Sequence, residues 1–188
     1  MRNEGGDPTG SVPIRLVSTG GVIPRKNPLL AVHTLAELRD RGVDASLRWI
    51  REAEQKSEAI RLASDLGVDA KFLGALSPQQ VQEELASADI FFAPTQGENF
   101  FVAAAEALVS GRPICASDQG GHTEYADPAF SEIVSEQTPG AYAEAIIRLR
   151  DKTRGVTAAE IAASVEWRFT AETVAAEYGA TYRNLLDA

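Results

Sequence analysis

The chain has 188 residues, of which 44% are hydrophobic, and this is enough for one domain with a sizeable core. Its formal net charge of -9 argues against a protein that binds nucleic acid or anionic membranes, because such binders need a basic face. No apolar run approaches the roughly 18 residues of a membrane span, and the N-terminus lacks the pattern of a signal peptide. The single cysteine, Cys115, allows no internal disulfide, so we expect a cytoplasmic domain with Cys115 in its core.

Strand-like and helix-like segments alternate along the chain. Residues 1–13 are polar and rich in glycine and proline, which predicts a flexible leader or the remnant of an interdomain linker. The predicted strands are 14–19, 46–50, 70–73, 89–94, 113–117 and 130–134. The predicted helices are 28–41, 53–66, 78–87, 101–110 and 140–151, followed by 158–165 and 171–186. Such alternation predicts an α/β fold with a doubly wound parallel sheet, as in Rossmann-like domains.

Two glutamates mark the most informative stretch of the chain. Glu98 follows the strand 89–94, and Glu106 lies in the next helix, with seven residues between the two. A carboxylate at the carboxyl end of a parallel strand lies where open α/β sheets bind ligands. The N-terminus of the helix offers free N–H groups to a phosphate, while a carboxylate accepts hydrogen bonds from hydroxyl groups. The pattern therefore indicates a site for a sugar joined to a phosphate.

This segment resembles the E-x7-E signature of retaining glycosyltransferases of family 4, which have the GT-B fold. The family pattern is roughly P-S-x-x-E-G-F-G, then a helix with a second E-A, G-x-P-V and a later G-G-x-x-E. It appears here as PTQGENFF, VAAAEALVSGRPICAS and GGHTE. The match is specific because three motifs occur in order at the family's spacing. It runs from about Ile14 to the end of the chain and covers only the donor-binding, C-terminal half of the family's enzymes.

The resemblance implies a nucleotide-sugar-binding domain over residues 14–155. The enzyme would move a hexose-type sugar from a nucleoside diphosphate sugar to an acceptor hydroxyl, with no metal and no cofactor besides this donor. An N-terminal, acceptor-binding domain is absent from the chain, and any peripheral membrane association would run through it. Without that domain we expect an inactive chain. The alternative is a non-catalytic domain that binds nucleotide sugars or other proteins.

The C-terminal helices, residues 156–188, are expected to pack on the domain or to cross to the missing N-terminal domain. In the family the last helix braces the N-terminal domain, and the run from Val165 to Thr170 followed by Tyr178 and Tyr182 resembles the family's ending. Plain packing of an amphipathic helix is the alternative, because Val174, Tyr178 and Leu185 recur at near-helical spacing.

The resemblance gives roles to the residues of the signature itself. Glu98 would face the hydroxyls of the donor sugar, and Glu106 would hold the two ribose hydroxyls. The alternative is helix capping for Glu98 and a solvated helix face for Glu106. The backbone N–H groups of Asn99, Phe100 and Phe101 would meet the sugar or the distal phosphate. Phe101 stands where the family commonly has glycine, so it either crowds the sugar or packs beneath the loop.

The turn after the first strand supplies positive charge. Lys26 matches a family lysine, and we expect it to stabilise the leaving diphosphate, since this fold uses no metal. A solvated surface lysine is the alternative. Gly20 and Gly21 are expected beside the donor, although Gly21 stands where the family has an arginine. Arg25 is adjacent and is expected to point elsewhere.

The turn after the second strand departs from the family, which has a glycine-rich V-G-x-G-P there. Here Arg51 follows Trp49 and Ile50, and no glycine lies between Trp49 and Ala53. Glycines permit close backbone approach to a phosphate, so that contact is in doubt. Arg51 either supplies positive charge from a new direction or is an ordinary surface residue.

The loop after the fifth strand completes the candidate site. Gly120, Gly121 and Glu124 match G-G-x-x-E, and we expect Glu124 to open a helical turn. His122 either touches the donor or acceptor or is merely exposed. His33 is expected to pack in an apolar helix, and no Cys/His cluster has the spacing of metal ligands.

Overall fold

A six-stranded parallel sheet forms the centre of the computed structural model, which describes residues 12–186. The strands are β1 (Ile14–Thr19), β2 (Ala45–Ile50), β3 (Asp69–Gly74), β4 (Ile90–Ala93), β5 (Ile114–Ser117) and β6 (Ser131–Val134). Their order is β3-β2-β1-β4-β5-β6 and every neighbouring pair is parallel. The predicted α/β doubly wound sheet is therefore confirmed. The order reverses between β1 and β4, which is where such sheets bind ligands.

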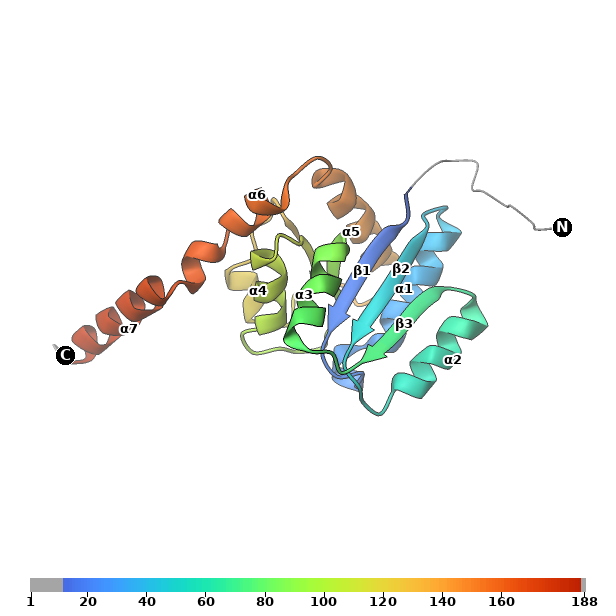
Figure 1. Cartoon of the computed structure of the whole chain (residues 1–188), viewed down its shortest axis with the longest axis horizontal. Coiled ribbons are helices and arrows are strands. Elements are labelled where there is room, and N and C mark those ends of the chain that lie inside the picture. The colour runs from blue at the N-terminus through green and yellow to red at the C-terminus, as the bar shows by residue number, and fades with distance from the viewer. Residues whose placement is uncertain (1–11, 187–188) are drawn as a thin grey trace.

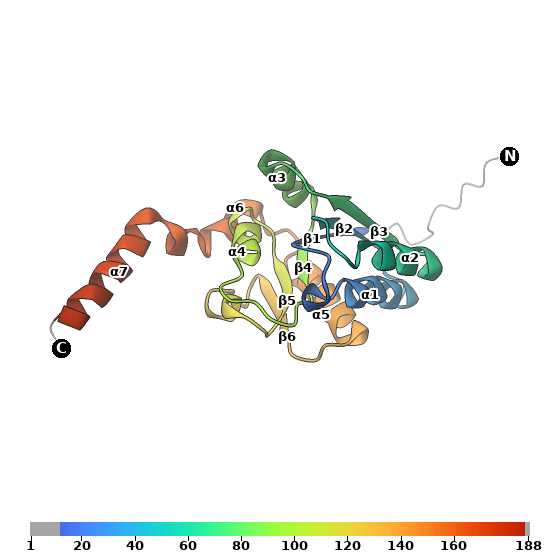
Figure 2. The ribbon, with the colours of Figure 1, turned by 90° about the horizontal axis from the view of Figure 1, so that it is seen from below.

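Helices cover both faces of the sheet (Figures 1 and 2). One face carries α1 (Pro28–Asp40), α2 (Lys56–Leu66) and α5 (Pro139–Lys152). The other carries α3 (Pro78–Ser87), α4 (Val102–Val109) and α6 (Ala158–Ala163). Each predicted element occurs with its ends within three residues of the prediction. The three 3-10 turns were not predicted: η1 (Pro24–Lys26), η2 (Gly121–Glu124) and η3 (Glu166–Phe169).

Local sequence explains where several helices begin. Proline occupies the first turn of α1, α3 and α5, where its missing N–H has no intrahelical partner to lose. Ser77 and Gln80 form a capping box at the start of α3, as Thr157 and Glu160 do at α6. The expectation for His33 was wrong, because His33 lies on the solvent side of α1, between the buried residues Val32 and Thr34.

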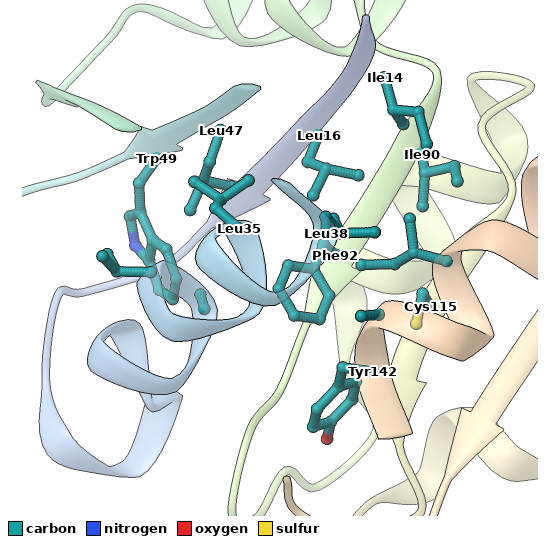
Figure 3. Close-up of a cluster of buried hydrophobic side chains, with 14 of the residues drawn as sticks. Ile14, Leu16, Leu35, Leu38, Leu47, Trp49, Ile90, Phe92, Cys115 and Tyr142 are labelled. Carbon is teal, nitrogen blue, oxygen red and sulfur yellow. The ribbon is translucent and has the colours of Figure 1, made fainter. Parts of the chain in front are cut away.

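The larger hydrophobic cluster lies between the sheet and helices α1, α2 and α5 (Figure 3). Leu16, Leu47 and Phe92 point from their strands toward Leu35 and its neighbours on α1. Cys115 is fully buried in the same cluster, as predicted, and this burial raises the pKa of its thiol. The cluster fixes the strands whose carboxyl ends build the site described below.

Helix α7 (Ala171–Leu186) extends away from the body of the domain (Figure 1). The exposed fraction is 38% for Val174, 64% for Tyr178 and 69% for Leu185. Packing of α7 on its own domain is thus not observed, and its crossing to another domain stays a prediction. The predicted leader lies outside the described residues except for Val12 and Pro13. Among the helices of residues 12–186, none is long and apolar enough to span a membrane.

Candidate functional site

A hollow of about 880 Å³ opens at the carboxyl ends of β1 and β2, beside the N-terminus of α4. It adjoins the point where the strand order reverses. It is lined by Thr19, Gly20, Arg25, Lys26, Ile50, Arg51, Val81, Gly97, Glu98, Asn99, Phe100, Phe101, Val102, Ala103 and Glu106. A second hollow, of about 570 Å³, lies at the opposite, amino ends of the strands, against Ile14, Ile90 and Pro113.

The first hollow brings together most of the residues singled out from the sequence: Gly20, Arg25, Lys26, Arg51, Glu98, Asn99, Phe100, Phe101 and Glu106. Gly21, Gly120, Gly121, His122 and Glu124 lie in the adjoining turns and not among its lining residues. Their roles toward a ligand stay predictions.

Glu98 is the centre of the charged network in this hollow. Its carboxylate forms ion pairs with Lys26 and with Arg25, whose Nη1 lies 2.8 Å from Glu98 Oε1. The hydroxyl of Thr95 donates to the same oxygen at 3.1 Å. The side chains of Glu98 and Lys26 are only 11% and 12% exposed. Helix α4 begins at Val102 and its N-cap is Phe101, so Glu98 does not cap this helix. The low exposure of Lys26 rules out a solvated surface lysine.

The prediction that Arg25 points away from the site was wrong. The 3-10 turn η1 brings Arg25 and Lys26 to the loop after β4. There the Arg25 carbonyl accepts a hydrogen bond from the Gln96 N–H at 2.7 Å. The Arg25 guanidinium donates to the Gly97 carbonyl and to Glu98. Sequence reasoning missed Thr95, although the serine of the family pattern P-S-x-x-E occupies its position.

Gly20 makes room for Lys26 to reach Glu98. The φ angle of Gly20 is +125°, and a Cβ built there would lie 3.0 Å from Lys26 Cε. The Gly20 carbonyl accepts a hydrogen bond of 2.8 Å from Nε1 of Trp49, which ties the ends of β1 and β2 together. A glycine at this position therefore lets the lysine lie across the end of β1.

Phe101 packs beneath the loop and supports the lysine. Its φ of +64° is left-handed, which favours glycine, yet the side chain is 4% exposed. Lys26 Nζ lies 4.7 Å from the centre of the Phe101 ring, within the range of a cation–π interaction. The ring of His122 lies 5.2 Å away on an edge-to-face geometry. Phe100, by contrast, is 52% exposed at the rim of the hollow.

Gly120 and Gly121 allow the loops after β4 and β5 to touch. A Cβ at Gly120 would lie 2.9 Å from Glu98 Cβ, and one at Gly121 would lie 2.7 Å from the Asn99 carbonyl. The Glu98 N–H also donates to the Gln119 carbonyl at 2.9 Å. The two glycines thus allow the loop after β5 to contact the backbone of Glu98 and Asn99 closely. Glu124 ends the turn η2 instead of opening a helical turn, which corrects the prediction.

His122 is fully buried, and the expectation of an exposed loop histidine was wrong. Its Nε2 lies 2.6 Å from the Ser117 carbonyl, so Nε2 carries the proton and donates. Its Nδ1 finds no hydrogen-bond partner among residues 12–186. Desolvation by burial lowers the pKa of His122, which favours the neutral ring.

Glu106 and Arg51 line the other side of the hollow. Glu106 projects from α4 and is exposed, so it lies at the rim and both of its interpretations stay open. Arg51 follows β2, is exposed, and has a φ of +109°. The turn thus has a backbone conformation that favours glycine, although the residue there is arginine.

Comparison with known proteins places the chain in a family. Residues 13–152 match the family described as Glycosyl transferases group 1. The D-inositol 3-phosphate glycosyltransferase of Nocardia farcinica is 32% identical over 86% of this chain and 39% of its own length. A GDP-mannose-dependent alpha-(1-6)-phosphatidylinositol dimannoside mannosyltransferase of Mycobacterium tuberculosis is 33% identical over 89% of this chain and 44% of its own length.

Solved structures share the fold. An Anabaena protein in complex with UDP and glucose matches with a TM-score of 0.74 and 19% identity, over 91% of this chain and 48% of its own. Sucrose-phosphate synthase from Thermosynechococcus elongatus gives a TM-score of 0.73 and 24% identity, over 93% and 46%. The chain spans about two fifths of the length of the curated relatives named above. From residue 13 to residue 152 it belongs to the group 1 glycosyl transferase family.

Proposed function

We propose that this chain is the donor-binding domain of a retaining glycosyltransferase that transfers a hexose-type sugar from a nucleoside diphosphate sugar to an acceptor hydroxyl. One observation carries the proposal. A carboxylate that is almost buried, Glu98, is held by Lys26, Arg25 and Thr95 at the carboxyl end of β4, in a hollow that Glu106 also lines. This set combines cations for a diphosphate with acceptors for hydroxyl groups.

The proposed transfer uses each group in a specific way. The diphosphate lies beside Lys26 and Arg25, whose positive charges stabilise it as it departs. The bond between the anomeric carbon and the phosphate oxygen breaks, and a bond to the acceptor oxygen forms on the same face of the sugar. The acceptor's proton passes to the departing phosphate oxygen. Glu98 orients the sugar through its hydroxyls, and Glu106 holds the ribose.

The acceptor is proposed to bind a second domain, outside this chain. The relatives are more than twice as long as the part that matches, which supports a partner domain. We propose that cationic side chains, and no metal ion, balance the diphosphate. We also propose a cytoplasmic location, because the single cysteine of the chain, Cys115, allows no internal disulfide.

Calorimetric titration of the chain with UDP-, GDP- and ADP-sugars tests the proposal. GDP-mannose belongs in the panel because a relative is named as dependent on it. We expect one nucleotide sugar to bind at submillimolar concentration. If none binds at millimolar concentration to a chain with a native circular dichroism spectrum, the proposal fails, and the alternative of an interaction domain is supported.

The variant Glu98→Gln separates recognition of the sugar from recognition of the phosphate. We expect its affinity for the nucleotide sugar to fall about ten- to a hundredfold, because a charged hydrogen-bond acceptor is lost. Affinity for the bare nucleotide should stay the same or rise, since Lys26 and Arg25 are released from Glu98. Glu37→Gln, which breaks a surface ion pair with Arg41, is the matched control and should change neither affinity. Equal losses for both ligands would contradict a sugar-facing Glu98.

A further inference from the structure

Arg51 holds a backbone conformation that L side chains rarely adopt. Its φ is +109°, a region that favours glycine, and it follows β2 directly. Its N–H donates to the Gly74 carbonyl at the end of β3, at 2.7 Å, where the register between the two strands shifts. The end of the sheet therefore imposes this conformation, and glycine would be the relaxed residue. Strained residues that persist in such positions cluster at sites of function.

The side chain of Arg51 differs from the other two cations of the hollow. Lys26 and Arg25 both pair with Glu98. Among the carboxylates of residues 12–186, none lies within ion-pair distance of the Arg51 guanidinium, although Arg51 lines the same hollow. A guanidinium stays charged and presents donors in a fork that fits phosphate oxygens. Arg51 is thus a cation available to a ligand.

Arg51 decides the net charge of the hollow. Lys26, Arg25 and Arg51 carry three positive charges, and Glu98 and Glu106 carry two negative charges. A diphosphate linked at both ends carries one negative charge on each phosphate. With Arg51 the lining has an excess of one positive charge that attracts such a ligand, whereas without Arg51 the lining would be neutral.

The backbone that carries Arg51 is anchored at the neighbouring strand end. Gly21, at the turn after β1, contributes no side chain there. The indole of Trp49 ties the end of β2 to Gly20, so Arg51 is held two residues from a fixed point. We propose that Arg51 binds the diphosphate of the donor. The inference rests on the proposed function, since it assigns one more residue to the same ligand.

The variant Arg51→Gly tests the inference, because ligand affinity and stability should change in different directions. The first step is to find which of UDP, GDP and ADP binds the unmutated chain best. We expect Arg51→Gly to weaken that nucleotide about ten- to a hundredfold and to leave the affinity for the matching nucleoside unchanged. The melting temperature should stay the same or rise by up to about 4 °C, since glycine relaxes the backbone. Arg61→Ala, which removes an exposed arginine from α2, is the control and should alter neither quantity.

Three outcomes would overturn the inference. An unchanged nucleotide affinity in Arg51→Gly, with the unmutated chain binding normally, rejects the role of Arg51 and leaves the proposed function intact. An equal loss for the nucleoside assigns Arg51 to the base or ribose instead of the diphosphate. No binding of any nucleotide to the unmutated chain rejects both proposals together.

Discussion

Individual side chains in the hollow are held by more than one partner. Glu98 is shared by two cations and a hydroxyl, and Lys26 is also supported by the ring of Phe101. Glu98 pairs with the two cations that a diphosphate would need under the proposed function, Lys26 and Arg25. A diphosphate must therefore compete with the Glu98 carboxylate for these two cations. The sugar hydroxyls of the same ligand can donate new hydrogen bonds to Glu98. This exchange favours a ligand that has both phosphate and hydroxyl groups over one that has phosphate alone.

Burial of His122 predicts a loss of stability in mild acid. Its pKa is lowered in the folded protein, so the unfolded chain binds a proton that the folded one does not. The stability from this group is complete above the ordinary pKa of about 6.5 and declines as the pH falls toward the folded value. We expect the variant His122→Gln to have a shallower decline of the free energy of unfolding between pH 7 and 5. The difference is at most about 1.4 kcal/mol per pH unit.

Urea denaturation of both proteins at several pH values measures this effect. His33→Gln, which removes an exposed histidine from α1, is measured beside it as the matched control. The same slope in His122→Gln and the unmutated chain would show that other groups dominate acid unfolding.

At the scale of elements, the close contact between α4 and α6 depends on a glycine, Gly111. Gly111 follows α4 with a φ of +74°, and a Cβ there would lie 2.5 Å from both the Cβ and the carbonyl oxygen of Ala158 in α6. Gly111→Ala should destabilise the chain by about 2–4 kcal/mol, from backbone strain and overpacking together. A fall of about 4–16 °C in melting temperature follows.

Gly67→Ala separates the cost of backbone strain at a positive φ from the cost of the steric clash with Ala158. Gly67 follows α2 with a φ of +63°, and nothing lies within 4 Å of a Cβ built there. It should cost only about 1 kcal/mol. Calorimetric melting of both variants compares them, and equal losses would mean that the contact of α4 with α6 contributes nothing.

The elements were predictable where one local pattern decides them. Apolar runs predicted each strand, and apolar residues at helical spacing predicted the helices, three of which (α1, α3 and α5) also have a proline in the first turn. The 3-10 turns were not predictable, because they depend on contacts such as that between Arg25 and the loop after β4. The same contact places the Arg25 side chain in the hollow, where it pairs with Glu98. His122 packs against Phe101, which lies 21 positions away in the sequence. Local hydrophobic periodicity does not predict a contact between residues so far apart, so the burial of His122 was not predictable.

The whole molecule presents apolar surface that its own domain does not cover. Trp167 is 52% exposed, and Tyr178, Tyr182 and Leu185 on α7 are each more than 60% exposed. Exposed apolar patches of this kind mark surfaces that meet other proteins or domains. The relatives, which are more than twice as long as the matched part, supply a candidate for that partner. We therefore interpret α7 as a segment whose packing partner lies beyond this chain.

The isolated chain is therefore expected to bind a donor without transferring its sugar. Under the proposed function the hollow binds a nucleotide sugar, but transfer also needs an acceptor hydroxyl held close to the anomeric carbon. Loss of that positioning can remove about 7–11 kcal/mol of catalysis. Release of nucleoside diphosphate from the best-binding nucleotide sugar should thus stay near the background rate, with or without a sugar alcohol as acceptor. Joining the chain to the N-terminal domain of a relative should raise this rate, and Glu98→Gln in the joined protein should lower it again. Rapid turnover by the chain while it sediments as a monomer would show that one domain is sufficient.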